Sequence, residues 1–108
     1  MKLCISNIAW DQANDEQMYK ICAEIGYDGI EIAPTRIFPE NPYEHIEDAG
    51  HWARNLSDKY GLKVYSCQSI WYGRNENIFE SEKDRECLLE YSKKMFSFAE
   101  AVGANNIV

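Results

Sequence analysis

The 108-residue sequence lacks the glycine-rich loop with which many α/β proteins cradle phosphate groups. Nucleotide-binding folds place such a loop after the first strand, but residues 9–13 contain no glycine. No Walker A sequence occurs anywhere in the chain. The sequence therefore predicts either a barrel or an open sheet that does not use the phosphate-loop mechanism.

Positive charge and long apolar runs are also scarce. The chain contains 11 Lys and Arg residues and 18 Asp and Glu residues, which gives a formal net charge of −7. This balance argues against nucleic acid as a partner, because binding to a phosphate backbone needs clustered basic side chains. No apolar run approaches the roughly 18 residues of a membrane helix, and residues 1–10 are too short and too polar for a secretory signal. We therefore expect a soluble, cytoplasmic protein with no membrane contact.

The cysteines form no Cys-x-x-Cys pair. They lie far apart in apolar or periodic segments, which favours reduced, buried thiols in a cytoplasmic protein over disulfides. The four are Cys4, Cys22, Cys67 and Cys87.

Short runs of β-forming residues alternate with helical stripes of apolar residues. The predicted strands are residues 3–8, 28–33, 62–68 and 106–108. The predicted helices are residues 14–25, 41–60 and 81–102.

Three sequence patterns predict where these helices begin. Asn14 precedes Gln17 by three residues, and Ser81 precedes Asp84 by three, as in a capping box. Residues 41–44 (Asn-Pro-Tyr-Glu) offer an N-cap, a proline at the first helical position and a glutamate at the third.

Glycines mark the helix ends. Gly26, Gly61 and Gly103 each follow a helical stripe and precede a strand within a few residues, as expected of C′ glycines. Gly50 lies inside the second helical stripe and is expected to split that helix into two pieces.

Strands that alternate with helices predict a parallel sheet. A complete (β/α)₈ barrel needs about 250 residues, and this chain supplies three βα units and the edge of a fourth. The sequence predicts a single α/β domain over residues 1–108. We interpret it as the N-terminal part of a TIM barrel, because a final parallel strand without a covering helix is an unusual place for a domain to end.

The connections after strands are longer than those after helices and carry aromatic and polar residues. Ligands of parallel α/β folds bind at the carboxyl ends of the strands, so the three long connections predict a ligand-binding face there. They are residues 9–13, 34–40 and 69–80.

Glu31 is the most informative single residue of this face. It lies between Ile30 and Ile32 near the end of a strand, so it points to the opposite face from both, toward a barrel interior. Burying a carboxylate there costs free energy unless it bonds to a partner group or has a functional role. We expect Glu31 to orient a substrate, with a structural bond to backbone, Lys2 or Lys63 as the alternative.

Further candidate substrate-binding residues lie at strand ends and in the long connections. Asn7 and Gln68 could meet the hydroxyls of a sugar-like ligand or bind loop backbone. Trp10 and Trp71 could be apolar walls for a sugar ring, or pack over the barrel mouth. Arg74, and also Arg36, could bind an anion through the guanidinium fork.

The sequence contains no complete catalytic set. The two histidines, His45 and His51, are six residues apart, whereas helical zinc pairs use a spacing of four. We therefore expect no metal site and no catalytic residue within these 108 residues.

Three segments resemble the xylose-isomerase-like TIM barrels, which comprise sugar phosphate isomerases/epimerases and belong with the AP endonuclease family 2 superfamily. Residues 25–32 (IGYDGIEI) resemble the second-strand motif of these proteins. Residues 68–74 (QSIWYGR) with 76–79 (ENIF) resemble the third-strand loop of a bacterial branch, and residues 99–108 (AEAVGANNIV) its third helix and fourth strand. The resemblance covers the whole chain in order.

The resemblance implies a (β/α)₈ barrel that acts as a metal-dependent sugar or sugar-phosphate isomerase or epimerase. It implies a divalent metal ion in the full-length protein, with a glutamate moving a proton next to a carbonyl group. The metal ligands and catalytic carboxylates come mostly from later strands, so we expect this segment alone to be inactive. The ligand that the resemblance implies is a small sugar or sugar phosphate.

Two alternatives remain at this point. The same superfamily includes endonucleases that act at abasic DNA sites, but these have a histidine ligand where this chain has Gln68 and Ser69. The chain could also be a non-catalytic half-barrel that forms a homo-oligomer through its sheet edges.

Overall fold

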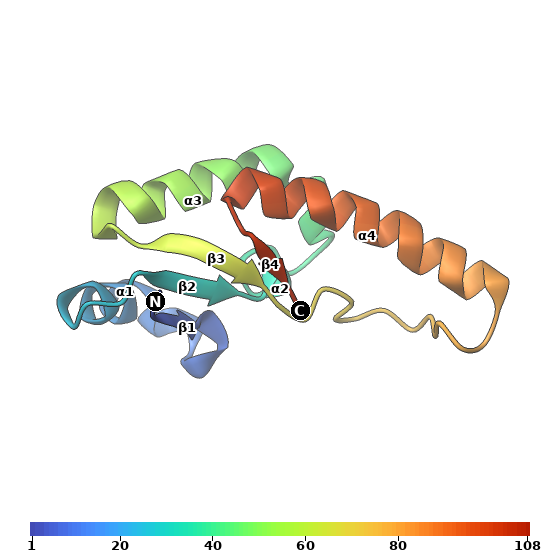
Figure 1. Cartoon of the computed structure of the whole chain (residues 1–108), viewed down its shortest axis with the longest axis horizontal. Coiled ribbons are helices and arrows are strands. Elements are labelled where there is room, and N and C mark those ends of the chain that lie inside the picture. The colour runs from blue at the N-terminus through green and yellow to red at the C-terminus, as the bar shows by residue number, and fades with distance from the viewer.

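The structure, a computed structural model, describes all 108 residues and alternates strands with helices (Figure 1). The elements in chain order are β1 (Cys4–Ser6), η1 (Asn7–Ala9), η2 (Gln12–Asn14), α1 (Asp15–Glu24), β2 (Gly29–Ile32), α2 (Pro34–Ile37), η3 (Pro42–Glu44), α3 (Ile46–Tyr60), β3 (Lys63–Cys67), α4 (Glu82–Val102) and β4 (Asn106–Ile107). All strand pairs are parallel and the strand order is β1-β2-β3-β4. The predicted parallel α/β architecture is confirmed.

The β2–β3 pair contains an irregularity that sequence periodicity does not show. Ile30 pairs with Val64, but the next residue, Glu31, pairs with Ser66, so β3 has one extra residue at Tyr65. A bulge of this kind bends a strand and changes where the following side chains point. Here it places Ser66 opposite Glu31.

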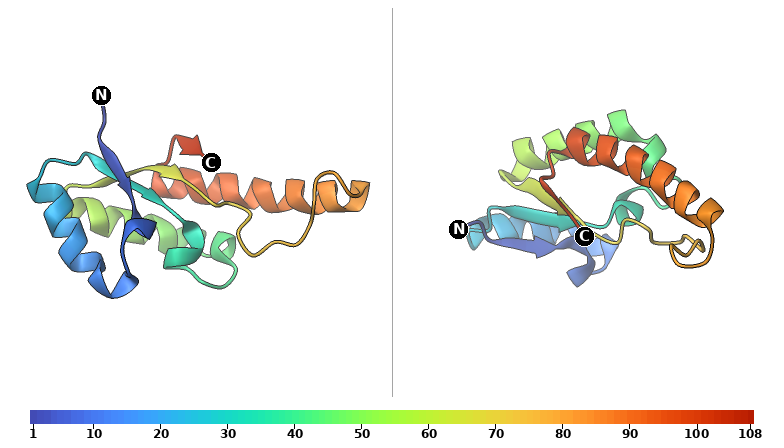
Figure 2. Two further views of the ribbon diagram at one scale, coloured as in Figure 1. Left: turned by 90° about the horizontal axis from the view of Figure 1, so that it is seen from below. Right: turned by 45° about the vertical axis from the view of Figure 1, so that its right-hand side comes forward.

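The hydrophobic core lies between one face of the sheet and the helices. In β2, the alternate residues Ile30 and Ile32 are buried there, as the period of two in a strand requires. In β3, Val64 and Cys67 are buried on the same face although they are three residues apart, because the bulge at Tyr65 adds one residue between them. Figures 1 and 2 show α3 and α4 side by side along the sheet. The helix residues of the core are Tyr19, Cys22, Ala49, Leu56, Met95, Phe98, Ala99 and Val102.

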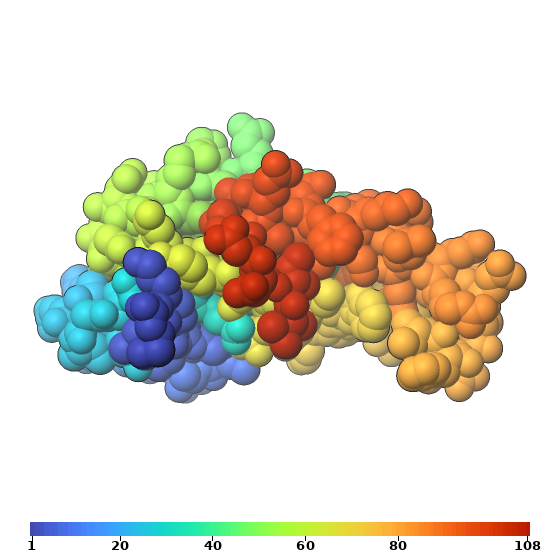
Figure 3. All heavy atoms as spheres, viewed as in Figure 1, coloured from blue at the N-terminus to red at the C-terminus, as the bar shows by residue number.

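The molecule is elongated because α4 and the segment before it extend beyond the sheet (Figures 1 and 3). Its principal extents are 48 × 29 × 24 Å. Residues 68–81, which we call loop 3, run outward from the end of β3 to the start of α4, and α4 then returns toward the sheet (Figure 1). None of the helices combines the length and the apolar composition that crossing a membrane would require.

One of the three predicted helix starts is confirmed, and the other two are wrong in their details. Ser81 accepts a hydrogen bond from the Asp84 amide at 3.0 Å and caps α4. Asn14 makes no capping bond, because the single turn η2 leads directly into α1. Asn41 adopts a left-handed conformation (φ +46°) before the single turn η3, and α3 begins only at Ile46.

The expectation that Gly50 splits the second helix is also wrong. Helix α3 is continuous from Ile46 to Tyr60. Gly50 is buried where α3 meets α4, and a Cβ atom there would lie 3.5 Å from the Ala101 carbonyl oxygen. This is an ordinary van der Waals distance, so the junction of the two helices has room for a methyl group at this position. Gly61 and Gly103 end α3 and α4 in left-handed conformations, as predicted.

Candidate functional site

Two cavities at the carboxyl edge of the sheet share a wall formed by Ser69 and Tyr72. The first, which we call the loop cavity, has a volume of about 420 Å³. The second, which we call the apolar cavity, measures about 460 Å³. The loop cavity is lined by Ile8, Ala33, Thr35, Arg36, Pro39, Ser69 and Tyr72. The apolar cavity is lined by Ser69, Ile70, Trp71, Tyr72 and Val108.

The loop cavity draws its walls from the segments after β1, β2 and β3. These segments converge because parallel strands end at the same edge of a sheet, which is where ligands of such folds bind. Another cavity, also of about 460 Å³, lies away from this edge between α3, the end of α4 and the start of β3. The loop cavity is therefore the better candidate for a functional site.

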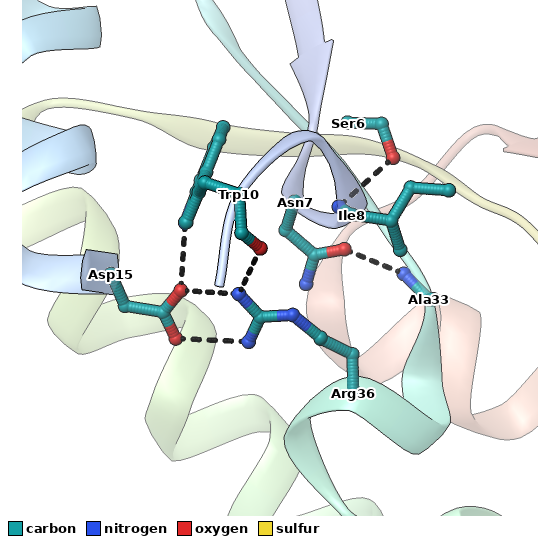
Figure 4. Close-up of polar contacts among 7 residues, drawn as sticks. All are labelled: Ser6, Asn7, Ile8, Trp10, Asp15, Ala33 and Arg36. Carbon is teal, nitrogen blue, oxygen red and sulfur yellow. Dashed lines mark hydrogen bonds and ion pairs between the residues drawn. The ribbon is translucent and has the colours of Figure 1, made fainter. Parts of the chain in front are cut away.

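An ion pair joins the segments that follow β1 and β2 (Figure 4). Arg36 donates to both carboxylate oxygens of Asp15, at 2.8 and 3.3 Å, and to the Trp10 carbonyl oxygen at 3.0 Å. The side chains of Arg36 and Asp15 are only 15% and 26% exposed. This arrangement, which we call the Arg36 clamp, fixes one wall of the loop cavity.

Trp10 belongs to the clamp and lines neither cavity. Its indole nitrogen donates to Asp15 at 2.8 Å, and its ring packs edge-on against Tyr19 with centroids 5.9 Å apart. A sugar-stacking role for Trp10 stays a prediction. The structure packs the ring against Tyr19 of α1.

Asn7 ties the end of β1 to the end of β2 (Figure 4). Its Oδ1 accepts a hydrogen bond from the Ala33 amide at 3.0 Å, and the residue is fully buried. Its Nδ2 group is buried without a hydrogen-bond partner, which costs free energy in a folded protein. Asn7 therefore lies behind the walls of the loop cavity.

Glu31 and Gln68 are each bonded to a serine of another strand: Glu31 to Ser66 of the neighbouring β3, and Gln68, which follows β3, to Ser6 of β1, two strands away. Ser66 donates to Glu31 Oε2 at 2.6 Å, and the amide nitrogen of Gln68 donates to the Ser6 hydroxyl. Neither lysine considered for Glu31 bonds to it: Lys2 pairs with Asp28, and Lys63 forms no ion pair. The Glu31 side chain thus has an oxygen left to accept a further bond.

Trp71 and Arg74 are held against α4. The Trp71 indole donates to the Ser92 hydroxyl at 2.9 Å, although Trp71 also lines the apolar cavity. Arg74 forms an ion pair with Glu76 and lies 4.6 Å from the centre of the Tyr91 ring. Arg74 contributes to neither cavity at the strand ends, so its predicted role in substrate binding stays a prediction.

The comparisons with known proteins identify the architecture. No protein-family model and no curated protein matches the sequence. Among solved structures, the chain is similar to the apo form of 3-keto-D-glucoside 4-epimerase YcjR from E. coli, with a TM-score of 0.65 and 21% identity. The match covers 99% of this chain and 36% of the epimerase, so the chain spans about a third of that protein's length. The fold is that of part of a TIM barrel.

This barrel segment contains no group of three His, Cys, Asp or Glu side chains that could hold a metal ion. The divalent metal implied by the family resemblance therefore has no ligand set among these residues. His45 instead stacks on Phe38, with centroids 5.1 Å apart, and His51 contacts Arg54.

Sequence reasoning did not single out Thr35 and Tyr72 as site residues, although both line the loop cavity. Their place in the long connections after β2 and β3 is the only sequence signal of that position. Arg36, and Ser69 at the end of the third predicted strand, are the lining residues whose side chains the sequence did indicate. Sequence cannot show that Trp71 turns toward α4 while its neighbour Tyr72 lines both cavities.

Proposed function

We propose that residues 1–108 are the N-terminal part of a sugar or sugar-phosphate isomerase or epimerase, a barrel enzyme that moves a proton next to a carbonyl group. The observation that carries this proposal is the structural match to the keto-glucoside epimerase over 99% of the chain. The loop cavity at the carboxyl edge supports it, since barrel enzymes bind their substrates there.

In this proposal Glu31 and Gln68 orient the substrate. Glu31, already bonded to Ser66, accepts a hydrogen bond from a substrate hydroxyl, and Gln68 positions a neighbouring group. Asn7 holds the ends of β1 and β2 together, and Trp71 forms part of the adjacent apolar wall. No proton-transfer step is assigned through a metal ion, because these residues supply no site for one.

In this proposal residues 1–108 contribute to substrate binding but do not catalyse the reaction by themselves. The partner of this chain is a small sugar, and residues 1–108 form one incomplete barrel domain. We expect the purified 108-residue chain to show no epimerisation, with or without added Mn²⁺ or Mg²⁺. An activity that depends on metal and resides in this chain alone would contradict the proposal.

Glu31→Gln in the native protein tests the proposed role of Glu31. Epimerisation of a 3-keto-glucoside is followed by NMR, and we expect kcat/KM to fall about tenfold to a hundredfold, because the charge-assisted hydrogen bond is weakened. Glu100→Gln, on α4 and away from both strand-end cavities, is the matched control. Unchanged turnover and unchanged stability in Glu31→Gln would remove Glu31 from the site.

A further inference from the structure

We propose that the loop cavity holds an uncharged, unphosphorylated sugar ring that stacks on Tyr72. The inference rests on the proposed function and narrows its substrate class. It applies to the part of the substrate that contacts the segments after β1, β2 and β3.

The charge within the loop cavity is already balanced. Arg36 is the only formally charged residue among those lining it. Its guanidinium group faces both oxygens of Asp15 and the Trp10 carbonyl oxygen. A phosphate group would have to displace the Asp15 carboxylate, since bidentate binding needs the same fork of donors. The cavity thus offers no free cation to a phosphorylated ligand.

The other candidate phosphate ligand is occupied elsewhere. Arg74 pairs with Glu76 and lies over the Tyr91 ring. It faces a cleft on α4 that it shares with Cys87 and Lys94. Neither arginine that the sequence offered for anion binding is therefore free at the carboxyl edge.

Tyr72 has the placement that a stacking platform needs. It lines both cavities, and 70% of its surface is exposed. A turn closed by the Tyr72 amide and the Ser69 carbonyl oxygen, 2.9 Å apart, fixes its backbone. Sugar rings present C–H faces that pack on aromatic rings, while their hydroxyls seek polar partners. The hydroxyl-bearing residues Thr35 and Ser69 lie in the same wall.

The size of the loop cavity agrees with this occupant. Its volume of about 420 Å³ lies at the lower end of the ~300–1,000 Å³ typical of small-molecule sites. Ile8 and Pro39 add apolar surface beside the hydroxyl-bearing residues. This combination fits a single neutral ring.

The test compares methyl β-D-glucopyranoside with glucose 6-phosphate as NMR probes of the ¹⁵N-labelled chain. We expect the glucoside to shift the amide signals of Thr35, Ser69 and Tyr72, and glucose 6-phosphate to bind at least about fivefold more weakly. Tyr72→Ala should weaken glucoside binding about fivefold to tenfold, in the range measured for aromatic stacking, and Tyr72→Phe should retain it. Phe79→Ala is the matched control, because Phe79 is an exposed aromatic residue of loop 3 that lines neither cavity.

The outcomes separate this inference from the proposed function. Tighter binding of glucose 6-phosphate at these amides, or unchanged binding in Tyr72→Ala, would overturn the neutral-ring subsite. Absence of any shift from either sugar would also overturn it, while epimerisation by the native protein would leave the proposed function standing. Loss of both binding and native epimerisation would contradict both proposals.

Discussion

At the scale of single residues, the four thiols differ in their surroundings. Cys22 and Cys67 are buried, whereas Cys4 and Cys87 are partly exposed, and all four are free. Burial, with the nearby charge of Glu31, raises the pKa of Cys67 to about 12. Thiol reactivity requires the thiolate, so Cys67 should be inert in the folded protein.

Alkylation with iodoacetamide at pH 8 tests this difference. A pKa of about 12 leaves roughly one Cys67 thiol in ten thousand ionised at that pH. We expect Cys87 to be modified first and Cys67 only after denaturation, as measured by peptide mass spectrometry. Rapid labelling of Cys67 under native conditions would show that its surroundings are more open than described.

The Arg36 clamp makes a second prediction at the residue scale. Arg36→Ala removes the only side-chain partner of the Trp10 carbonyl oxygen and leaves the mostly buried Asp15 carboxylate with the Trp10 indole alone. We expect a loss of about 1–3 kcal/mol in the free energy of unfolding, measured by urea denaturation. Lys93→Ala, which removes an exposed ion pair with Glu90, is the control and should change stability by less than about 0.5 kcal/mol.

At the scale of elements, two buried glycines have opposite roles. A Cβ atom on Gly29 of β2 would overlap the Lys63 carbonyl oxygen and the Tyr65 ring, because the bulged strand β3 lies directly against it. On Gly50 of α3 the same atom would make contacts of 3.4 Å or more, with Arg54 as the nearest neighbour. The first glycine is required by the fold, and the second has room for a methyl group.

Thermal unfolding of the two alanine variants checks this contrast. Gly29→Ala should destabilise the chain by about 3 kcal/mol or more, since β2 and β3 must separate. Gly50→Ala should stabilise it by about 0.5–1 kcal/mol through helix propensity. A destabilised Gly50→Ala variant would mean that α3 and α4 pack more tightly than the distances indicate.

The elements also show what sequence can and cannot predict. The strand and helix order follows from apolar periodicity, and the end of α3 at Gly61 follows from the conformational freedom of glycine. Apolar periodicity does not predict the bulge at Tyr65, because the bulge depends on how β3 packs against Gly29. Likewise, Arg36 and Asp15 are 21 residues apart, and only the folded chain brings them together.

At the scale of the whole molecule, the sheet has two open edges. Strands β1 and β4 each pair on one side only. Exposed apolar residues lie in or beside these edge strands. They are Leu3, Ile8, Ile107 and Val108. Unpaired edge strands can form hydrogen bonds with a strand of another molecule. We therefore expect the isolated chain to self-associate through these edges.

Light scattering over a range of concentrations tests the open edges. We expect the mass of the 108-residue chain to rise above that of a monomer as concentration increases. Ile107→Lys should reduce this rise, because a charge on an edge strand opposes pairing. A constant monomer mass for the unmodified chain would exclude association through these edges and with it the homo-oligomer alternative.

The walls of the loop cavity are anchored to different parts of the molecule. The Arg36 clamp locks the segments after β1 and β2 to the start of α1, while Trp71 ties loop 3 to Ser92 in the middle of α4. We therefore expect the position of the wall that contains Tyr72 to depend on α4, and the position of the opposite wall to depend on α1. A substitution on α4 that never touches a ligand can then alter ligand affinity by changing the width of the cavity.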